Sequence, residues 1–212
     1  MTNKNLLIIF TRNPELGKVK SRLAKDVGNK TALAIYKDLL KHTHDIAINV
    51  EADRYVFYSE SIQEHDMWTK DKFTKLLQKG DDLGLKMLNA FKEGFNAGYE
   101  NIAIIGSDIL ELTSDQINLA FNALKNTNVV IGPAVDGGYY LLGLSKLIEP
   151  LFKNKAWGTE TVLKSTVSDL AEINQSYKLL SELNDIDYVS DIKDSHMILK
   201  YNLASYNQEK TC

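Results

Sequence analysis

Short apolar runs alternate along the chain with stretches in which apolar residues recur every three or four positions. Residues 6–10 are apolar throughout, which is typical of a strand buried on both faces of a sheet. Further strands are predicted at residues 55–58, 102–105, 129–131 and 139–144, a short element at 72–78 and an edge strand at 177–180.

Helices are predicted between these strands. Positions spaced by four form one apolar helix face, made of Leu83, Met87, Phe91 and Phe95. Asp81 or Asp82 is expected to cap this helix, and Gly98 lies just beyond its end. Other helices are predicted around residues 33–40, at 114–124, from Thr159 or Glu160 to 170, and at 189–203.

This alternation predicts the fold class: a three-layer α/β sandwich with a mostly parallel central sheet. The hairpin-like run 129–144 predicts some antiparallel pairing late in the sheet. Residues 1–204 are expected to form a single domain, followed by a polar tail at 205–212. In such sheets ligands bind outside the carboxyl ends of the strands, so the residues that follow each strand are the candidates for function.

Composition narrows the classes of partner. Lys and Arg total 25, Asp and Glu total 28, and the formal net charge of −3 argues against a nucleic-acid partner. The single cysteine, Cys212, allows no intrachain disulfide and no thiolate zinc cluster. No apolar stretch approaches the ~20 residues of a membrane span, and no signal-peptide pattern is present. We therefore expect a cytoplasmic protein without a membrane span.

A basic segment follows the first predicted strand. Between residues 12 and 25 there are five cations and one acid, among them Arg12, Lys18, Lys20 and Arg22. Lys18 and Arg22 share a face if the segment is helical, and Lys20 joins them if it is extended. The segment therefore either binds phosphate oxygens or forms a solvated loop. It is not a P-loop, because Val19 stands where that motif needs Ser or Thr.

Carboxylates follow later strands. Asp108 comes directly after strand 102–105, where a carboxylate either holds Mg²⁺ or caps the next turn. Asp185 and Asp187 share a face if their segment is extended, and they either add a second metal carboxylate or cap a helix. Gly84 weakens its helix by about 1 kcal/mol relative to Ala, which close approach of a ligand or a neighbouring element would explain.

Two segments suit the substrate side of a cleft. Asp136, Gly137 and Gly138 either form only a hairpin turn or let a ligand approach the backbone, with the Asp136 carboxylate in the cleft. Trp157 either stacks on a sugar or base or packs in the core.

Taken in order, these segments resemble the DUF2064 family, also called selenodomain-associated transferase 1. The resemblance covers residues 6–199 and rests on the motifs FTRNP with GKVKSRL, DLGLKM, IGSD, GPAVDGGYYLLG and WGT. The family belongs to the nucleotide-diphospho-sugar transferase superfamily, and the 2-phospho-lactate guanylyltransferases are similar relatives. Two departures are Asp108-Ile109-Leu110, where the family has Asp-Cys-Pro, and Lys86, where it has Arg.

The resemblance implies a GT-A-type fold that binds a nucleotide or nucleotide-sugar, with Mg²⁺ or Mn²⁺ as cofactor. By this analogy the nucleotide and phosphate loop contains Arg12, Lys18, Lys20 and Arg22, and Gly84 joins this set. Asp108 and Asp187 match the metal-binding acids. Asp136 is the candidate catalytic base, and the substrate side is lined by Gly137, Gly138 and Trp157.

Three functions follow from this resemblance. The first is a metal-dependent glycosyltransferase that transfers a sugar to an acceptor whose hydroxyl is activated by a carboxylate such as Asp136. The second is a nucleotidyltransferase that releases pyrophosphate. The third is a non-catalytic nucleotide-binding module. The sequence leaves the base, sugar, acceptor and oligomeric state open.

Overall fold

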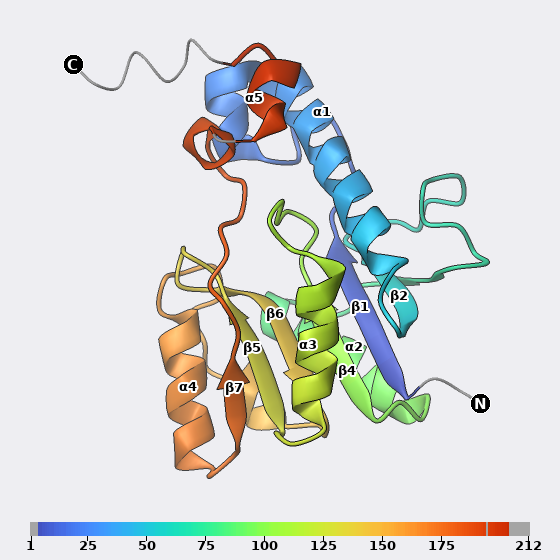
Figure 1. Cartoon of the computed structure of the whole chain (residues 1–212), viewed down its shortest axis with the longest axis vertical. Helices are drawn as coiled ribbons and strands as arrows, with labels where there is room; N and C mark the ends of the chain where they lie inside the picture. Colours follow the sequence, from blue (N-terminus) through green and yellow to red (C-terminus); the bar gives the residue numbers. More distant parts are fainter. Residues whose placement is uncertain (1–3, 194, 204–212) are drawn as a thin grey trace.

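Seven strands form one sheet in the computed structural model, which describes residues 4–193 and 195–203 (Figure 1). The strand order is β3-β2-β1-β4-β6-β5-β7. The strands span β1 Asn5–Thr11, β2 Asp53–Tyr58, β3 Thr74–Leu77, β4 Asn101–Ile105, β5 Val129–Pro133, β6 Tyr139–Leu144 and β7 Tyr177–Leu179. All of the predicted strands are therefore present, including the short element before residue 78.

Most neighbouring strands run parallel, as the sequence predicts. β1 pairs in parallel with β2 and β4, β2 with β3, and β5 with β7. β6 alone runs against its neighbours β4 and β5. The turn between β5 and β6 contains Gly137 at φ 85°, which a residue with a side chain rarely adopts. The antiparallel hairpin predicted at 129–144 is confirmed.

Helices cover both faces of the sheet. They span α1 Ser21–Ala47, α2 Leu83–Asn96, α3 Ser114–Leu124, α4 Val162–Glu172 and α5 His196–Lys200, with short 3₁₀ turns η1 Glu149–Phe152 and η2 Val189–Ile192. Apolar side chains of α1 and α3 pack on one face, and those of α2 and α4 on the other. The three-layer sandwich is confirmed. Asp82 is the cap of α2, because its side chain accepts from the Leu85 N–H at 2.7 Å.

The first half of α1 extends beyond the sheet and packs against the C-terminal elements (Figure 1). The helix is broken at Gly28, whose φ of 78° and ψ of 156° are not helical. A separate apolar cluster joins α1 to η2 and α5 through Leu23, Ile35, Ile192, Met197 and other residues. This cluster positions the start of α1, which carries the basic segment.

The single helix predicted at 189–203 is wrong. The structure has η2 and α5 instead, and the Ser195 hydroxyl caps α5 by accepting from the Met197 N–H at 3.3 Å. The Asp191 carboxylate accepts from the backbone N–H groups of Asp187 and Tyr188. Such side chains offer the backbone alternatives to a continuous helix. The predicted tail at 205–212 lies outside the described residues.

α4 begins at Val162, slightly later than predicted. Residues Thr159 to Thr161 form a turn in which the Thr159 hydroxyl donates to the Ala156 carbonyl at 2.8 Å.

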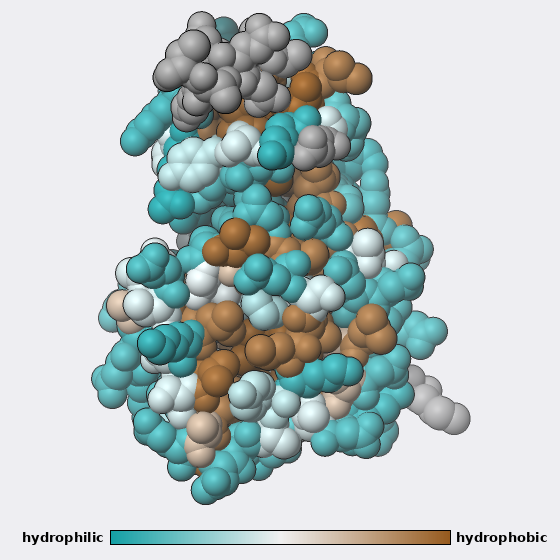
Figure 2. Space-filling model, turned by 60° about the vertical axis from the view of Figure 1, so that its left-hand side comes forward, coloured by the Kyte–Doolittle hydropathy of each residue, from teal (hydrophilic) through white to brown (hydrophobic). Residues whose placement is uncertain are grey.

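Figure 2 shows the surface on the side that carries α4 and β7, where hydrophobic residues gather between hydrophilic areas. Among the described residues, no helix is both long and apolar enough to cross a membrane.

Candidate functional site

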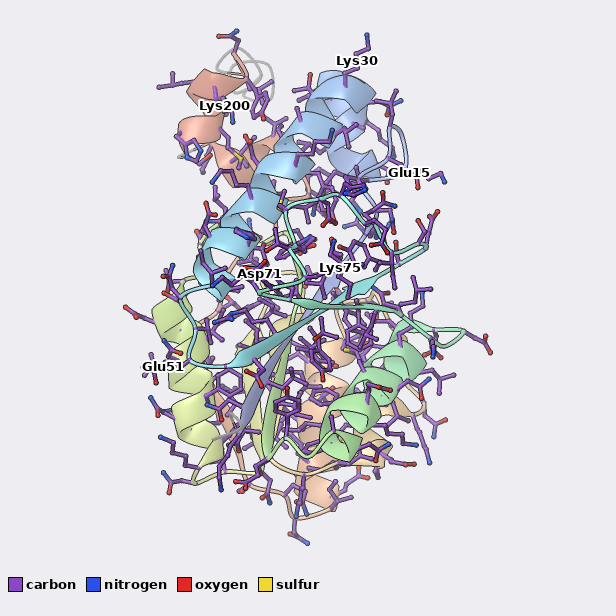
Figure 3. The ribbon with its side chains drawn as sticks, turned by 90° about the vertical axis from the view of Figure 1, so that its right-hand side faces the viewer. Glu15, Lys30, Glu51, Asp71, Lys75 and Lys200 are labelled. Carbon is purple, nitrogen blue, oxygen red and sulfur yellow. The ribbon has the colours of Figure 1, made fainter. Side chains whose placement is uncertain are left out.

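A polar cleft of about 700 Å³ lies at the carboxyl ends of β1 and β4. We call it the main cleft. Its charged lining comprises Arg12, Lys18, Lys20, Arg22, Glu60, Lys86, Asp108, Asp136, Asp185 and Asp187. Figure 3 shows the side chains in this view, with Glu15 labelled in the loop after β1 and Lys75 labelled in β3. The cleft lies where a mostly parallel sheet is expected to bind its ligand.

Hydrogen bonds from two polar side chains hold the loop after β1 in position. Asn13 is buried; its amide donates to the Ser61 carbonyl at 2.8 Å and accepts from the Glu60 N–H at 3.1 Å. The Tyr36 hydroxyl of α1 accepts from the Arg12 N–H at 3.0 Å and lies 3.2 Å from the buried Ser107 hydroxyl. The loop that carries the cations is therefore fixed relative to both β2 and β4.

Lys20 lies between the two predicted metal-binding acids. Its ammonium donates to Asp108 Oδ2 at 2.8 Å and to Asp187 Oδ1 at 3.2 Å, and its side chain is only 6% exposed. Burial lowers the pKa of Lys20, but Asp108 and Asp187 outweigh burial and raise it above its ordinary value. Arg22 Nη1 donates to Asp187 Oδ2 at 2.6 Å. The structure thus brings four predicted residues into one ionic cluster.

The backbone positions this cluster. Lys20 is the N-cap of α1 and adopts the left-handed conformation at φ 46°, which is uncommon for a residue with a side chain. On the opposite side, the Ile186 N–H donates to the Asp108 carbonyl at 3.1 Å, which holds the segment of Asp187 beside Asp108. Asp108 and Asp187, which are 88 and 167 positions away from Lys20 in the sequence, therefore contact its side chain.

The remaining cations of the main cleft differ in how they are paired. Lys18 is exposed and bridges Glu15 at 2.7 Å and Glu60 at 3.4 Å. Within the described part of the chain, Arg12 and Lys86 form no ion pair, although both line the main cleft. These two cations are therefore available to a ligand. Lys86 was not among the predicted site residues. The tertiary structure shows that it lies on the side of α2 that faces the main cleft.

Asp185 is a sequence candidate that the family resemblance did not assign to the site. The sequence paired it with Asp187 as a metal carboxylate or a helix cap, and the structure places it in the lining of the main cleft. Burial, followed by the neighbouring Asp108, Asp187 and Asp136, raises the pKa of Asp185 to about 6. The pattern Asp-x-Asp after a buried position was the available sequence signal.

The carboxylates do not form a closed metal cage. Among residues 4–193 and 195–203, no group of three or more His, Cys, Asp or Glu side chains is placed to hold a metal ion. The protein supplies two carboxylates, Asp108 and Asp187, that converge on one cation position occupied by the Lys20 ammonium. Two carboxylates are the usual protein contribution to a Mg²⁺ site completed by phosphate oxygens and water.

A smaller cavity of about 170 Å³, which we call the side pocket, adjoins the main cleft. Six residues line both spaces: Leu83, Gly106, Asp108, Asp136, Gly158 and Asp185. Asp136 is exposed, and its Oδ1 accepts from the Gly138 N–H at 2.8 Å. The half-buried Trp157 forms one wall, edge-on to Tyr139 with ring centroids 6.5 Å apart. Asp136, Gly138 and Trp157, all predicted for the substrate side, therefore line the side pocket.

Two predicted glycines are needed for packing against their neighbours. A Cβ on Gly84 would lie 2.5 Å from Trp157 Nε1, and one on Gly137 would lie 2.2 Å from the Glu160 carbonyl oxygen. Of the two explanations that the sequence left open for Gly84, the structure shows a neighbouring element at close approach: Gly84 is buried and makes room for Trp157. Gly137 is the contact point for the segment that leads into α4, and its carbonyl accepts from the Leu163 N–H at 2.9 Å.

Solved structures share this architecture. A protein from Desulfovibrio desulfuricans G20, provisionally described as a nucleotide-diphospho-sugar transferase, is 28% identical, with 98% of each chain covered and a TM-score of 0.85. The 4-diphosphocytidyl-2C-methyl-D-erythritol synthase of Anaerococcus prevotii DSM 20548 is 12% identical, with 95% and 96% covered and a TM-score of 0.58. The inositol-1-phosphate CTP transferase of T. maritima is 12% identical, with 98% and 97% covered and a TM-score of 0.56. The last two show likeness of fold alone. None of the curated proteins matches the chain.

The fold is therefore the one seen in these nucleotide-diphospho-sugar transferase and cytidylyltransferase structures. Residues 42–159 match the family model described as "Uncharacterized protein conserved in bacteria (DUF2064)". The chain belongs to the DUF2064 family, and the resemblance seen in its motifs is confirmed.

Proposed function

We propose that the chain is a metal-dependent glycosyltransferase-like enzyme that binds a nucleotide-sugar in the main cleft and transfers the sugar to an acceptor. One observation carries this proposal: Lys20, Asp108 and Asp187 form an ionic cluster beside the unpaired cations Arg12 and Lys86. This arrangement suits a diphosphate, because charge-assisted hydrogen bonds to phosphate are strong. The likeness to a nucleotide-diphospho-sugar transferase supports it.

The donor set fits Mg²⁺ or Mn²⁺. The Lys20 ammonium stands in for a cation, because the carboxylates of Asp108 and Asp187 both reach it at hydrogen-bonding distance. Oxygen ligands of this kind suit hard divalent ions. Bound to these two acids, the ion would neutralise charge on the phosphate oxygens of the leaving nucleoside diphosphate.

The protein's own groups have distinct parts in the proposed reaction. Arg12 and Lys86 bind phosphate oxygens, and their charges stabilise the negative charge that develops on the leaving group. Asp136, at the boundary of the main cleft and the side pocket, accepts the proton of the acceptor hydroxyl. Trp157 shields the side pocket from water on one side and orients the group within it.

Nucleotidyl transfer, similar to that of a 2-phospho-lactate guanylyltransferase, is the second candidate. It is favoured by likeness of fold to the inositol-1-phosphate CTP transferase and to the methylerythritol cytidylyl enzyme. The same cations would then stabilise departing pyrophosphate during attack on an α-phosphate. The products separate the two: glycosyl transfer releases a nucleoside diphosphate and nucleotidyl transfer releases pyrophosphate.

The first test is a thermal-shift panel of nucleotides and nucleotide-sugars, each with and without Mg²⁺ or Mn²⁺. At least one nucleotide-sugar is expected to raise the melting temperature, and more so with the metal, because a ligand that binds only the folded state stabilises it. A panel without any shift would contradict both transferase proposals. A nucleotide that binds but is never turned over, whatever the acceptor, would instead identify a non-catalytic nucleotide-binding module.

A further inference from the structure

The side pocket has charge of one sign only. Its ionisable acids are Asp108, Asp136 and Asp185, and of the residues that the structure describes, no Lys, Arg or His lines it. The rest of its wall is apolar, aromatic or small, and includes Tyr139, Trp157 and Val162. Asp108 is paired with Lys20 from the main cleft, whereas Asp136 and Asp185 face a ligand in this pocket without a cation in its described lining.

The cations are confined to the neighbouring space. Arg12, Lys18, Lys20, Arg22 and Lys86 line the main cleft, and none of them lines the side pocket. Lys20 reaches Asp108 from the main-cleft side and is held there by Asp187 as well. The main cleft is therefore lined by five cations and five acids, and can offer cations to phosphate groups, whereas the side pocket is lined by acids alone and disfavours them.

Backbone donors do not change this division. α4 begins at the side pocket, and a helix start commonly binds anions. Here the Leu163 N–H donates to the Gly137 carbonyl at 2.9 Å, and the Val162 N–H lies 3.4 Å from the Thr159 carbonyl oxygen. The Gly138 N–H is taken by Asp136 Oδ1. These three backbone donors already have acceptors within the protein.

The aromatic wall favours the opposite kind of ligand. The Trp157 ring is held edge-on to Tyr139, and it packs directly on Gly84, which leaves no space behind it. An aromatic face attracts C–H groups and cations, and its attraction for a cation increases where water is excluded. Carboxylates accept hydrogen bonds from hydroxyl and ammonium groups but donate none when ionised.

We infer that the acceptor of the proposed transfer is a small alcohol or amino alcohol without negative charge, bound in the side pocket. This inference rests on the proposed function and adds the charge of its second substrate. The acceptor's hydroxyl or ammonium donors face Asp136 and Asp185, and its C–H surface lies on Trp157. A phosphorylated or carboxylated acceptor is rejected, because its charge would face two or three carboxylates.

The test uses matched pairs of probes that differ by one phosphate: myo-inositol with myo-inositol 1-phosphate, choline with phosphocholine, and glucosamine with glucosamine 6-phosphate. Binding is followed by tryptophan fluorescence, and Trp157→Phe separates the side-pocket signal from that of the buried Trp68. At least one unphosphorylated probe is expected to alter the Trp157 signal, and to bind at least about tenfold more tightly than its phosphorylated partner.

Charge variants provide the second readout. Asp136→Asn and Asp185→Asn are each expected to reduce the discrimination within a pair, because each removes one repelling charge. Glu172→Gln is the matched control: it makes the same charge change on an exposed residue at the far end of α4, and discrimination should stay as in the wild type. Discrimination that is unaltered in both Asp variants would contradict the inference.

Two further results would overturn it: a phosphorylated probe that binds as tightly as its partner, or no unphosphorylated probe that alters the Trp157 signal. Nucleotide binding is measured on the same protein by thermal shift. If a nucleotide binds and the probe pairs fail, only the inference about the acceptor is lost. If no nucleotide binds, the proposed function itself fails.

Discussion

The ammonium of Lys20 lies 2.8 Å from a carboxylate oxygen of Asp108, and its side chain is almost entirely buried. It also reaches Asp187 at 3.2 Å, so that one lysine is paired with both acids that the family resemblance assigns to a metal. A divalent ion that uses these acids must displace the ammonium, which would then be free to meet phosphate oxygens. Lys20 thus links the cationic segment after β1 to the acids after β4 and β7.

Lys20→Met is expected to raise the affinity for Mn²⁺ in the absence of nucleotide by about tenfold, since the competing ammonium is removed from the acid pair. Isothermal titration calorimetry of the folded variant gives the affinity. Lys25→Met, which removes an exposed cation of the same helix, should leave it unchanged. Equal or weaker Mn²⁺ binding by Lys20→Met would show that the ammonium does not compete for this position.

Arg12→Met is expected to weaken binding of any nucleotide identified by the thermal-shift panel by about tenfold, because one charge-assisted hydrogen bond to phosphate is lost. Titration calorimetry with and without the substitution checks this value. The control is Lys30→Met, which changes the charge equally at an exposed position of α1 that does not line the main cleft. Unaltered affinity in Arg12→Met would place the phosphates elsewhere.

Asp185→Asn is expected to stabilise the protein above pH 6. Burial and the neighbouring carboxylates raise the pKa of Asp185 to about 6, so the folded state binds a proton more readily than the unfolded state does. The ionised carboxylate therefore lowers the free energy of unfolding as pH rises from the ordinary carboxyl pKa of about 4 to about 6, and the loss is constant at higher pH. Melting temperatures between pH 4 and 8 should show the variant's advantage growing from about pH 4 to about pH 6 and then levelling off, while Glu172→Gln follows the wild-type profile.

Gly84→Ala is expected to destabilise the protein by about 1–3 kcal/mol, although Ala favours helices, because the added Cβ would overlap Trp157 and the Phe152 carbonyl oxygen. Urea unfolding measures the loss, and a shift of Trp157 fluorescence should accompany it. Glu93→Ala, at an exposed position of the same helix, should stay within about 0.5 kcal/mol of the wild type. A neutral Gly84→Ala would mean that Trp157 moves at no cost.

Lys155→Met is expected to cost about 1–3 kcal/mol, because it leaves Asp169 without its partner. The Lys155 side chain is fully buried and donates to Asp169 at 2.5 Å and to Ser165 at 3.2 Å. The pair ties the segment before α4, which carries Trp157, to the helix itself. Limited proteolysis should therefore cut this segment faster in the variant. Lys153→Met, whose exposed pair with Glu149 spans 3.8 Å, is the matched control and should be nearly neutral.

Local pattern was sufficient for most of the fold. The continuous apolar run at residues 6–10 is buried as β1 between two parallel strands, and the fourfold spacing from Leu83 to Phe95 is the buried face of α2. The last helix was mispredicted because Asp191 and Ser195 redirect the backbone, an effect that periodicity does not register. Hydrophobic periodicity indicates which face of a helix is buried, but it does not indicate how the side chains near the helix ends are hydrogen-bonded.

The candidate site, like the fold, could be predicted only in part from the sequence. The sequence by itself determined that cations follow the first strand, that acids follow later ones and that a glycine pair adjoins Asp136. Only the tertiary structure decided that Lys20 pairs with acids 88 and 167 positions away, that Gly84 accommodates Trp157, that Lys86 lines the main cleft, and that Asp185 lines it beside Asp187. The physical reason is that strand order and loop packing, which depend on the whole chain, set which strand ends meet, whereas local sequence sets only what each end carries.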